Sequence, residues 1–291
     1  MEKNVGIIGL GRVGMVAAEK YISEGYRVFG YARRPEVIAK FQELGGVHLE
    51  SPAQVASAVS TVIILVLNDR QVIDVVTGER GILEGAREDS LVICMSTINR
   101  GNLEWVAEQC AEKGVDFTDC PFTGGPGRVT TGTLTLIMAA SPEAVKRSRP
   151  VLEVIGAITL VGDRPGMGQA VKYCNQLLVT AIHGATMELI TLARKTGADP
   201  KQVCEVVGSG IAGNDYFRLL SKSILEGAPS PGGLGQLWKD VNIVVTTARE
   251  HNLPLLVTFA TAHYFNMGVA QNMENEDASR LIEVLQKMIS P

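Results

Sequence analysis

The sequence Val5-Gly6-Ile7-Ile8-Gly9-Leu10-Gly11-Arg12-Val13-Gly14 joins a short apolar run to a GxGxxG pattern, and a helical run over 15–23 follows it. Between a strand and a helix, such glycines allow a tight turn, close approach of the backbone to a pyrophosphate, and close packing of helix on strand. The helix N-terminus adds N–H groups that favour an anion. Residues 9–14 therefore predict a dinucleotide site, against the alternative that the glycines serve only the turn.

The end of the next strand-like run indicates which dinucleotide is bound, because it reads Gly30-Tyr31-Ala32-Arg33-Arg34-Pro35-Glu36. An NAD site of this kind has an Asp or Glu about 20 residues after the glycines, at the end of this second strand, but the strand end 30–35 contains no acid and the next one is Glu36. The guanidinium groups of Arg33 and Arg34 are suited to bidentate contacts with a 2′-phosphate. We therefore expect NADP(H) as the preferred cofactor and NAD(H) as an alternative. The competing interpretation is that both arginines are solvated loop charges.

Up to residue 163, short β-branched runs alternate with helical stretches, which is typical of a doubly wound, mostly parallel sheet in an α/β fold. Beyond 162–166 the pattern changes, because 167–195 carries apolar residues at helical spacing and the later segments also read as helices. We expect a dinucleotide-binding domain at 1–163 and an all-helical domain at 164–291, which opens with one long helix. The predicted strands are 4–9, 26–31, 61–67, 90–95, 115–119, 133–138 and 157–161, and the later predicted helices are 201–207, 214–226, 234–251, 256–268 and 276–288.

Composition narrows the classes of partner. The chain has 291 residues, with 27 Lys and Arg against 31 Asp and Glu, a net charge of −4, and 46% hydrophobic residues. This is a globular composition with enough length for a large core. Without a basic tract, the chain lacks the usual means of neutralising nucleic-acid phosphates, so we expect no nucleic-acid partner.

Cysteine, histidine and apolar patterns suggest a soluble chain in the cytoplasm. The five cysteines are scattered and odd in number, which fits reduced thiols. The N-terminus lacks a secretory pattern, and uninterrupted apolar runs such as 62–67 are too short to span a bilayer. The four histidines are too dispersed for a metal site, so we expect no metal and no membrane partner.

A glycine-rich turn at 119–128 is the first candidate for substrate binding. The sequence Thr123-Gly124-Gly125 follows a predicted strand and presents a hydroxyl together with unobstructed backbone N–H groups. Such a turn is able to form a concavity for a small carboxylate. The alternative is a turn that needs glycine only for a positive φ.

The second candidate is the start of the long helix, where Lys172 and Asn175 are three residues apart and so share a face. They lie where we expect a cleft between the two domains. Partial desolvation lowers the pKa of a lysine, and such a group exchanges a proton with a substrate oxygen more readily near neutral pH. The alternative is a surface lysine with a buried stem.

Taken in chain order, the motifs of this sequence resemble those of the β-hydroxyacid dehydrogenase family over nearly the whole chain. Gly9 to Gly14 resembles its GLGxMG start, Met95-Ser96-Thr97 its MST segment, and Pro121 to Gly125 its PVSGG loop. Three further matches are Gly132-Thr133-Leu134-Thr135 with GTLT, 166–175 with GxGxxxKxxN, and Lys239-Asp240 with the KD pair.

The resemblance implies a Rossmann domain, a long interdomain helix, an all-helical C-terminal domain, and a dehydrogenase with Lys172 as general acid or base. It also implies the contacts of the other residues. It assigns the substrate to Thr123, Gly124, Gly125, Asn175 and Ser96, and the cofactor to Gly9, Leu10, Gly11, Arg12, Val13, Gly14, Arg33, Arg34, Leu67, Thr97 and Lys239.

Departures from the family pattern bear on the substrate. Thr123 replaces a serine, and Arg128 replaces a glycine, either as a plain surface residue or to reach an extra acidic group. Two other functions stay open: an imine reductase on the same scaffold, and a non-catalytic NADP(H)-binding module. Because the long helix is so apolar, we also expect a homodimer or homotetramer.

Overall fold

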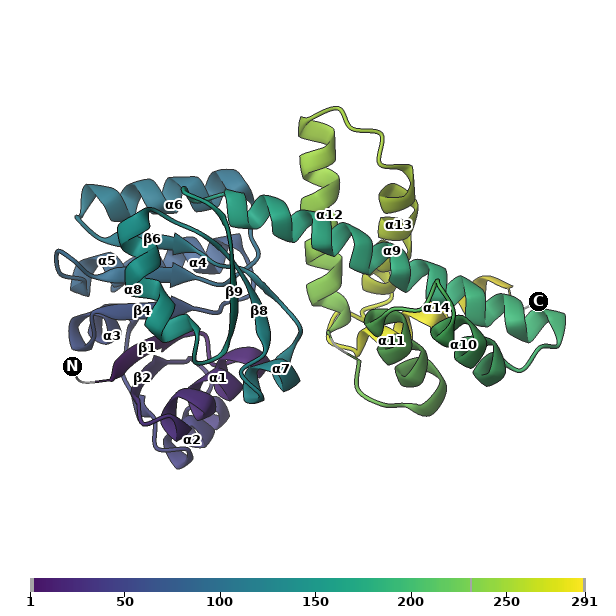
Figure 1. The fold of residues 1–291 in the computed structure, drawn as a ribbon, viewed down its shortest axis with the longest axis horizontal. Coiled ribbons are helices and arrows are strands. Elements are labelled where there is room, and N and C mark those ends of the chain that lie inside the picture. Colours follow the sequence, from purple (N-terminus) through teal and green to yellow (C-terminus); the bar gives the residue numbers. More distant parts are fainter. Residues whose placement is uncertain (1–2, 231, 290–291) are drawn as a thin grey trace. The chain divides into compact units, whose positions relative to one another are not determined.

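The computed structural model describes residues 3–230 and 232–289, and its strands form one sheet in the part of the chain up to Lys172 (Figure 1). The strands are β1 (Asn4–Ile8), β2 (Arg27–Tyr31), β3 (Val47–His48), β4 (Thr61–Ile64), β5 (Leu91–Cys94), β6 (Asp116–Asp119), β7 (Phe122–Thr123), β8 (Leu134–Ala139) and β9 (Gly156–Gly162). Their order is β3-β2-β1-β4-β5-β6-β8-β7, with β9 beside β8. The first six run parallel, while β8 is antiparallel to β6 and β7. The expected mostly parallel α/β sheet is confirmed, and the order 3-2-1-4-5-6 is that of dinucleotide-binding folds.

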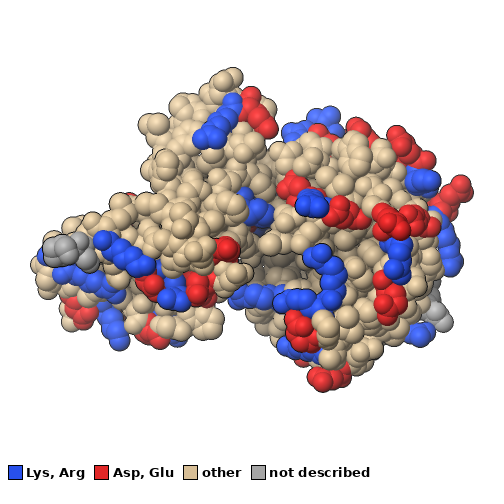
Figure 2. All heavy atoms as spheres, turned by 180° about the vertical axis from the view of Figure 1, so that it is seen from behind, with Lys and Arg blue, Asp and Glu red and all other residues tan. Residues whose placement is uncertain are grey.

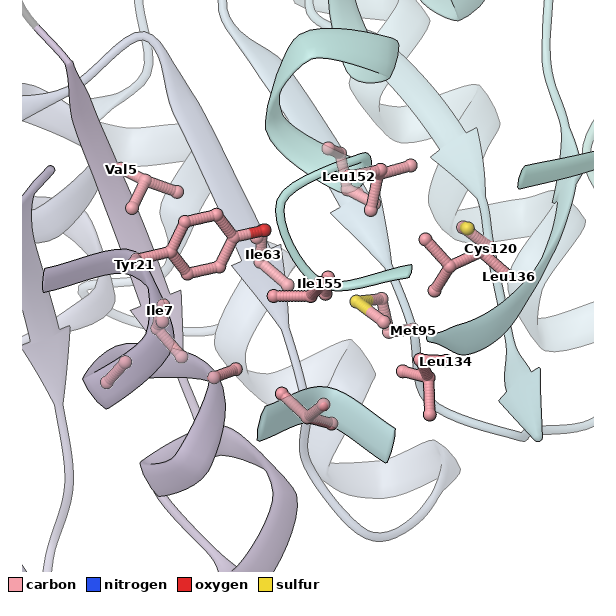
Figure 3. Packing of buried hydrophobic residues seen from close by; sticks show 14 of the residues in the cluster. Val5, Ile7, Tyr21, Ile63, Met95, Cys120, Leu134, Leu136, Leu152 and Ile155 are labelled. Atoms are coloured by element: carbon pink, nitrogen blue, oxygen red, sulfur yellow. The ribbon is translucent and has the colours of Figure 1, made fainter. Parts of the chain in front are cut away.

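Helices cover both faces of this sheet. They are α1 (Arg12–Ser23), α2 (Pro35–Glu43), α3 (Pro52–Ala58), α4 (Asp69–Thr77), α5 (Ile82–Gly85), α6 (Arg100–Glu112), α7 (Pro126–Thr130) and α8 (Pro142–Leu152). Because successive side chains of a strand point to opposite faces, β1 contributes Val5 and Ile7 to one apolar cluster and Ile8 to the other. Figure 3 shows the first cluster, in which Tyr21 of α1 lies beside Val5, Ile7 and Ile63. Burial on both faces explains why the central strands are almost entirely apolar.

The second compact unit starts at Tyr173 and is helical. Helix α9 (Met167–Thr196) begins in the first unit and continues into the second. It is followed by α10 (Pro200–Ser209), α11 (Asp215–Glu226), α12 (Leu234–Glu250), α13 (Leu256–Ala270), the 3-10 helix η1 (Ala278–Leu281) and α14 (Ile282–Ile289). Their core includes Met187 and Ile190 of α9 and Phe265 of α13, all fully buried. The predicted long helix and the predicted helical C-terminal region are therefore confirmed.

By length and composition alone, α9 is also able to cross a membrane, and it is the one helix in the described residues with this property. Uninterrupted apolar runs in the sequence are too short to span a bilayer, whereas α9 contains an 18-residue stretch with a mean hydropathy of 1.3 in which polar residues are interspersed. Of this apolar stretch, 44% is buried inside the chain, and the core helix of a soluble protein has the same features. The helix is therefore weak support for a membrane location.

Candidate active site

The turn between β1 and α1 has the geometry of a pyrophosphate site. Gly9 has a φ of +100°, a conformation that favours glycine. A Cβ on Gly14 would lie 2.0 Å from the backbone oxygen of Gly9, so only glycine lets α1 start this close to the strand. At Gly11, by contrast, a Cβ would meet nothing within 4 Å, and no side chain caps the helix there. The first turn of α1 therefore has N–H groups that no side chain of the N-cap residue caps, next to a glycine with open space on its Cβ side, and these residues fit a dinucleotide.

The sheet order reverses between β1 and β4, and ligands of open α/β sheets bind at such a point, beyond the carboxyl ends of the strands. Leu67 lies just after β4 with 53% of its surface exposed. Its backbone N–H donates to Oε1 of Gln71 at 2.9 Å, and Asn68 caps α4 through Oδ1, which accepts from the N–H of Gln71 at 3.0 Å. Two residues of the chain thus brace the loop beside the glycine turn.

At the end of β2, Arg33 and Arg34 are both exposed. Nη1 of Arg34 lies 3.6 Å from Oε1 of Glu36, and both of these side chains are about two-thirds exposed. Such an exposed ion pair contributes little to stability, so Arg34 loses little on turning to another anion.

The glycine-rich turn follows β7, whose residues Phe122 and Thr123 pair with β8. Gly124 and Gly125 have φ values of +128° and +73°, respectively, so both glycines are required by the backbone. The stem of the exposed Arg128 packs over Gly124, because a Cβ there would lie 2.6 Å from Cδ of Arg128. The turn is therefore held from one side by β8 and from the other by an arginine stem.

Lys172 lies on α9 at the edge of this turn, with only 7% of its surface exposed. Its Nζ donates a hydrogen bond of 2.6 Å to the backbone oxygen of Phe122, the residue before Thr123. The structure therefore brings the predicted proton-transfer residue to the start of the predicted carboxylate turn. Both belong to the first compact unit.

Two buried polar residues next to Lys172 were given no role in the sequence analysis, although both lie in motifs discussed there. Asp119 ends β6 and Gln169 lies in the first turn of α9, and both are fully buried. Burial raises the pKa of Asp119 to about 6, against hydrogen bonds from Gln169 and Gly166 that lower it. The sequence did contain a signal for these two residues: a carboxylate or amide side chain next to an apolar, buried strand end. Such polar groups are buried only where they have hydrogen-bond partners.

Ser96 and Thr97 lie in the loop after β5. Ser96 is buried, and its Oγ donates to the backbone oxygen of Val66 at 2.7 Å, so this hydroxyl ties the loop to the segment that follows β4. Thr97 is half-buried.

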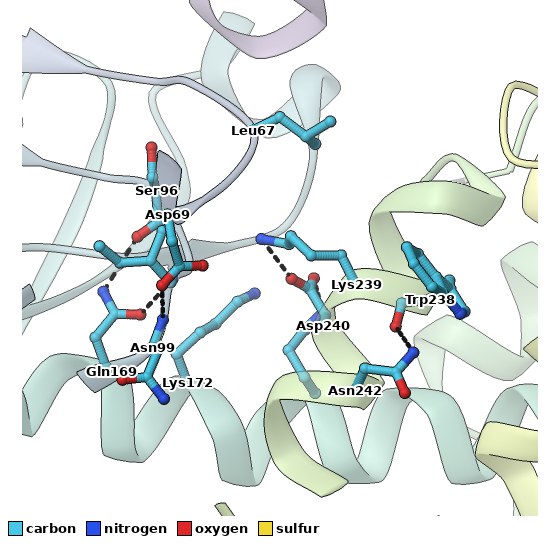
Figure 4. Close-up of polar contacts among 12 residues, drawn as sticks. Leu67, Asp69, Ser96, Asn99, Gln169, Lys172, Trp238, Lys239, Asp240 and Asn242 are labelled. Atoms are coloured by element: carbon cyan, nitrogen blue, oxygen red, sulfur yellow. Dashed lines mark hydrogen bonds and ion pairs between the residues drawn. The ribbon is translucent and has the colours of Figure 1, made fainter. Parts of the chain in front are cut away.

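The other predicted residues, Asn175 and Lys239, lie in the second unit. Nδ2 of Asn175 donates to Oε1 of Gln176 at 2.8 Å, and Nε2 of Gln176 donates to Oδ2 of Asp240 at 2.6 Å. Nζ of Lys239 lies 2.9 Å from Oδ1 of Asp240, which is almost fully buried (Figure 4). Asn175 and Lys239 are therefore joined through one buried polar chain on α9 and α12.

Comparisons with known proteins agree with this geometry. Residues 4–162 match the family model of the NAD binding domain of 6-phosphogluconate dehydrogenase, and residues 166–285 match that described as NAD-binding of NADP-dependent 3-hydroxyisobutyrate dehydrogenase. L-threonate dehydrogenase of Cupriavidus necator is 31% identical over 98% of this chain and 96% of its own length.

Two solved structures are similar over almost their whole length. The crystal structure of 3-hydroxyisobutyrate dehydrogenase from Salmonella typhimurium has a TM-score of 0.89 and 26% identity, covering 97% of this chain and 100% of that one. Psf3 in complex with NADP+ and 2-OPP has a TM-score of 0.88 and 25% identity, covering 97% of this chain and 99% of that one. With a Rossmann domain, a glycine turn fitted to a dinucleotide and relatives of this kind, the chain belongs to the β-hydroxyacid dehydrogenase family and is an NAD(P)-dependent dehydrogenase.

Proposed function

We propose that the chain is an NADP(H)-preferring dehydrogenase that interconverts a small β-hydroxy acid and its semialdehyde or keto acid, with Lys172 as the general acid or base. One observation carries this proposal. The Nζ of a nearly buried lysine lies 2.6 Å from the carbonyl of Phe122, directly before a turn that suits a carboxylate. A cation held beside an anion-binding turn fits a substrate that carries both a carboxylate and a reacting oxygen.

For the cofactor, the turn at 9–14 receives the pyrophosphate, and Arg33 and Arg34 receive the 2′-phosphate. We also assign Leu67, Thr97 and Lys239 to the cofactor, with Leu67 and Thr97 in the loops after β4 and β5. The bound nicotinamide supplies the hydride for reduction and accepts it in the reverse reaction.

For the substrate, the Thr123 hydroxyl and the N–H groups of Gly124 and Gly125 bind the carboxylate, and Asn175 binds the rest of the molecule. Ser96 supports the site through its loop. During reduction, the Lys172 ammonium donates a proton to the carbonyl oxygen as that oxygen gains charge, and in the reverse direction the neutral amine removes the hydroxyl proton. The Phe122 carbonyl accepts a hydrogen bond from Nζ in both directions and so keeps it at the turn.

The same features weigh against the two other functions. A non-catalytic binding module needs neither a buried lysine nor a carboxylate turn, and a reaction on imines does not use a carboxylate turn. On the face shown in Figure 2, acidic and basic side chains alternate over much of the surface, and several basic ones gather in one continuous group. We propose no nucleic-acid partner, because the net charge is −4 and the sequence has no basic tract to neutralise phosphates. We further propose that the enzyme acts in the cytoplasm as a homodimer or homotetramer.

The proposal is tested by replacing Lys172 with alanine and assaying NADPH turnover with the oxo acids of L-threonate and 3-hydroxyisobutyrate. Loss of a general acid or base typically costs about 10²- to 10⁴-fold in kcat, whereas NADPH affinity stays near that of the wild type. Lys195→Ala, an exposed lysine on the same helix, is the matched control. Turnover of Lys172→Ala within about tenfold of the wild type contradicts the assignment.

A further inference from the structure

A buried carboxylate anchors the start of α9. Oδ2 of Asp119 accepts hydrogen bonds from the backbone N–H of Gly166 at 2.9 Å and of Gln169 at 3.1 Å. Oδ1 accepts a third from Nε2 of Gln169 at 2.9 Å. The N–H groups at the start of a helix have no partners within the helix and favour a negative charge. Asp119 therefore joins the end of β6 to the first turn of α9.

The amide of Gln169 uses both its donors and its acceptor. Besides the bond to Asp119, Nε2 donates to the backbone oxygen of Ser96 at 3.1 Å, and Oε1 accepts from the N–H of Ile98 at 3.1 Å. Figure 4 shows Gln169 reaching the Ser96 segment. Because an amide offers two donor hydrogens on one side and an acceptor on the other, only Gln satisfies this set with its length.

Packing fixes the rotation of the helix as well. A Cβ on Gly168 would lie 2.8 Å from Oδ2 of Asp119 and 2.9 Å from the backbone oxygen of Ile137. At Gly168 the first turn of α9 thus rests directly on the end of β6 and on β8, with no room for a side chain at this position. A shift or rotation of the helix would break these contacts, so the start of α9 has one position.

These contacts close a ring that includes Lys172. Along the strand side, Asp119 is followed three residues later by Phe122, and along the helix side, Gln169 is followed three residues later by Lys172. The ring closes at one end through the bonds between Asp119 and Gln169, and at the other through the 2.6 Å bond from Nζ to the Phe122 oxygen. Both arms are too short to move independently.

We infer that Asp119 and Gln169 are positioning residues, which act through Lys172 by fixing its Nζ against the carboxylate turn while holding the 96–98 loop. This inference rests on the proposed role of Lys172. Neither residue contacts the reacting atoms. A misplacement of about 1 Å is enough to cost up to about 10² in rate, so the ring is a condition for fast proton transfer.

The test is a double-mutant cycle that combines Asp119→Asn with Lys172→Ala. Asp119→Asn keeps the shape of the side chain but places an NH₂ group opposite the N–H donors of Gly166 and Gln169. We expect kcat to fall about 10- to 100-fold and its pH profile to change. In the Lys172→Ala background the same substitution is expected to change kcat less than twofold, because the group it positions is gone. Gln169→Met, which keeps the size without hydrogen bonds, is the second variant if Asp119→Asn fails to fold, and is expected to give the same pattern.

Thr118→Val is the matched control, because Thr118 precedes Asp119 on β6, is fully buried, and makes a 2.8 Å hydrogen bond to Ser148. It is expected to lower the thermal midpoint but to leave kcat and its pH profile unchanged. The inference is overturned if Asp119→Asn or Gln169→Met lowers kcat by the same factor with and without Lys172, or no more than Thr118→Val does. The proposed function fails separately, if Lys172→Ala alone keeps kcat within about tenfold.

Discussion

Two glycines at the start of α1, Gly11 just before the helix and Gly14 in its first turn, make it possible to separate packing from cofactor binding, by replacing each with alanine. At Gly14 the new Cβ lies 2.0 Å from the backbone oxygen of Gly9, and real Cβ contacts essentially never fall below 3.0 Å. The helix must therefore move by at least 1.0 Å from the strand, since backbone lies on both sides of the contact. Overpacking of this kind costs about 1–3 kcal/mol, offset in part by the higher helix propensity of alanine.

At Gly11 the new Cβ meets nothing within 4 Å, so the fold tolerates it. The loss of unfolding free energy is limited to the preference for Gly over Ala at an N-cap, at most about 1 kcal/mol. The methyl group occupies the space through which the backbone approaches the pyrophosphate. We therefore expect Gly14→Ala to lower both stability and NADPH affinity, and Gly11→Ala to lower affinity with a loss of unfolding free energy of at most about 1 kcal/mol.

Urea unfolding and fluorescence titration with NADPH measure the two quantities. Loss of one hydrogen bond to a charged phosphate, about 1.5–3 kcal/mol, raises Kd about 10- to 100-fold. If Gly11→Ala binds NADPH as tightly as the wild type, the pyrophosphate does not lie over this turn. If Gly14→Ala leaves the free energy of unfolding unchanged, the close approach of helix and strand is not what requires glycine there.

Two further predictions concern charge. Replacing Arg33 and Arg34 with alanine is expected to raise the KM for NADPH about 10- to 100-fold and to leave that for NADH within about twofold, as measured by steady-state kinetics against Arg149→Ala, an exposed arginine on α8. Equal losses with both cofactors would contradict a 2′-phosphate contact. Burial lowers the pKa of His183 to about 4, so between pH 6.5 and 4 the unfolded state binds more protons and the free energy of unfolding falls by about 3 kcal/mol on acidification. The raised pKa of Asp119 has the opposite effect on stability over nearly the same pH range. Because His183→Gln removes only the histidine contribution, we expect this variant to lose less stability than the wild type between pH 7 and pH 4, as measured by urea unfolding. An unchanged pH dependence would refute this.

The sequence predicted the sheet and the long helix because their apolar periodicities extend over many residues. It missed β3 and β7, since strands of two residues carry no periodic signal and form only by pairing with neighbours. The single helix predicted at 276–288 is divided in the structure into the 3-10 helix η1 and the α-helix α14. The Asp277 side chain accepts a hydrogen bond from the N–H of Ser279, and the chain begins there with the tighter 3-10 turn. Helix α1 begins at Arg12 rather than Met15, because the last three residues of the glycine motif, 12–14, are already helical.

The candidate site was predicted unevenly for a similar reason. Lys172 and Thr123 stand in motifs whose spacing is local, so their roles were open to inference from the sequence alone. The link between Asp119 and Gln169 joins residues 50 positions apart, and nothing in either segment indicates its partner. Sequence patterns report periodicity within an element, whereas partners of buried polar groups depend on tertiary contacts.

The start of α9 differs from the other helix starts in a way that favours a functional reason. Among the described residues, six α-helices begin with a local side-chain cap, at Ser51, Asn68, Asn99, Ser141, Asp199 and Asn214, and the 3-10 helix η1 begins with one at Asp277. Such caps satisfy N–H groups of the first turn with a residue next to it in sequence, and all but Ser51 are at least partly exposed. Asp119 instead reaches α9 from another element while fully buried, and its pKa of about 6 corresponds to about 3 kcal/mol of stability lost at neutral pH. A local cap would stabilise the helix equally well, but it would not tie Lys172 to the carbonyl at the carboxylate turn.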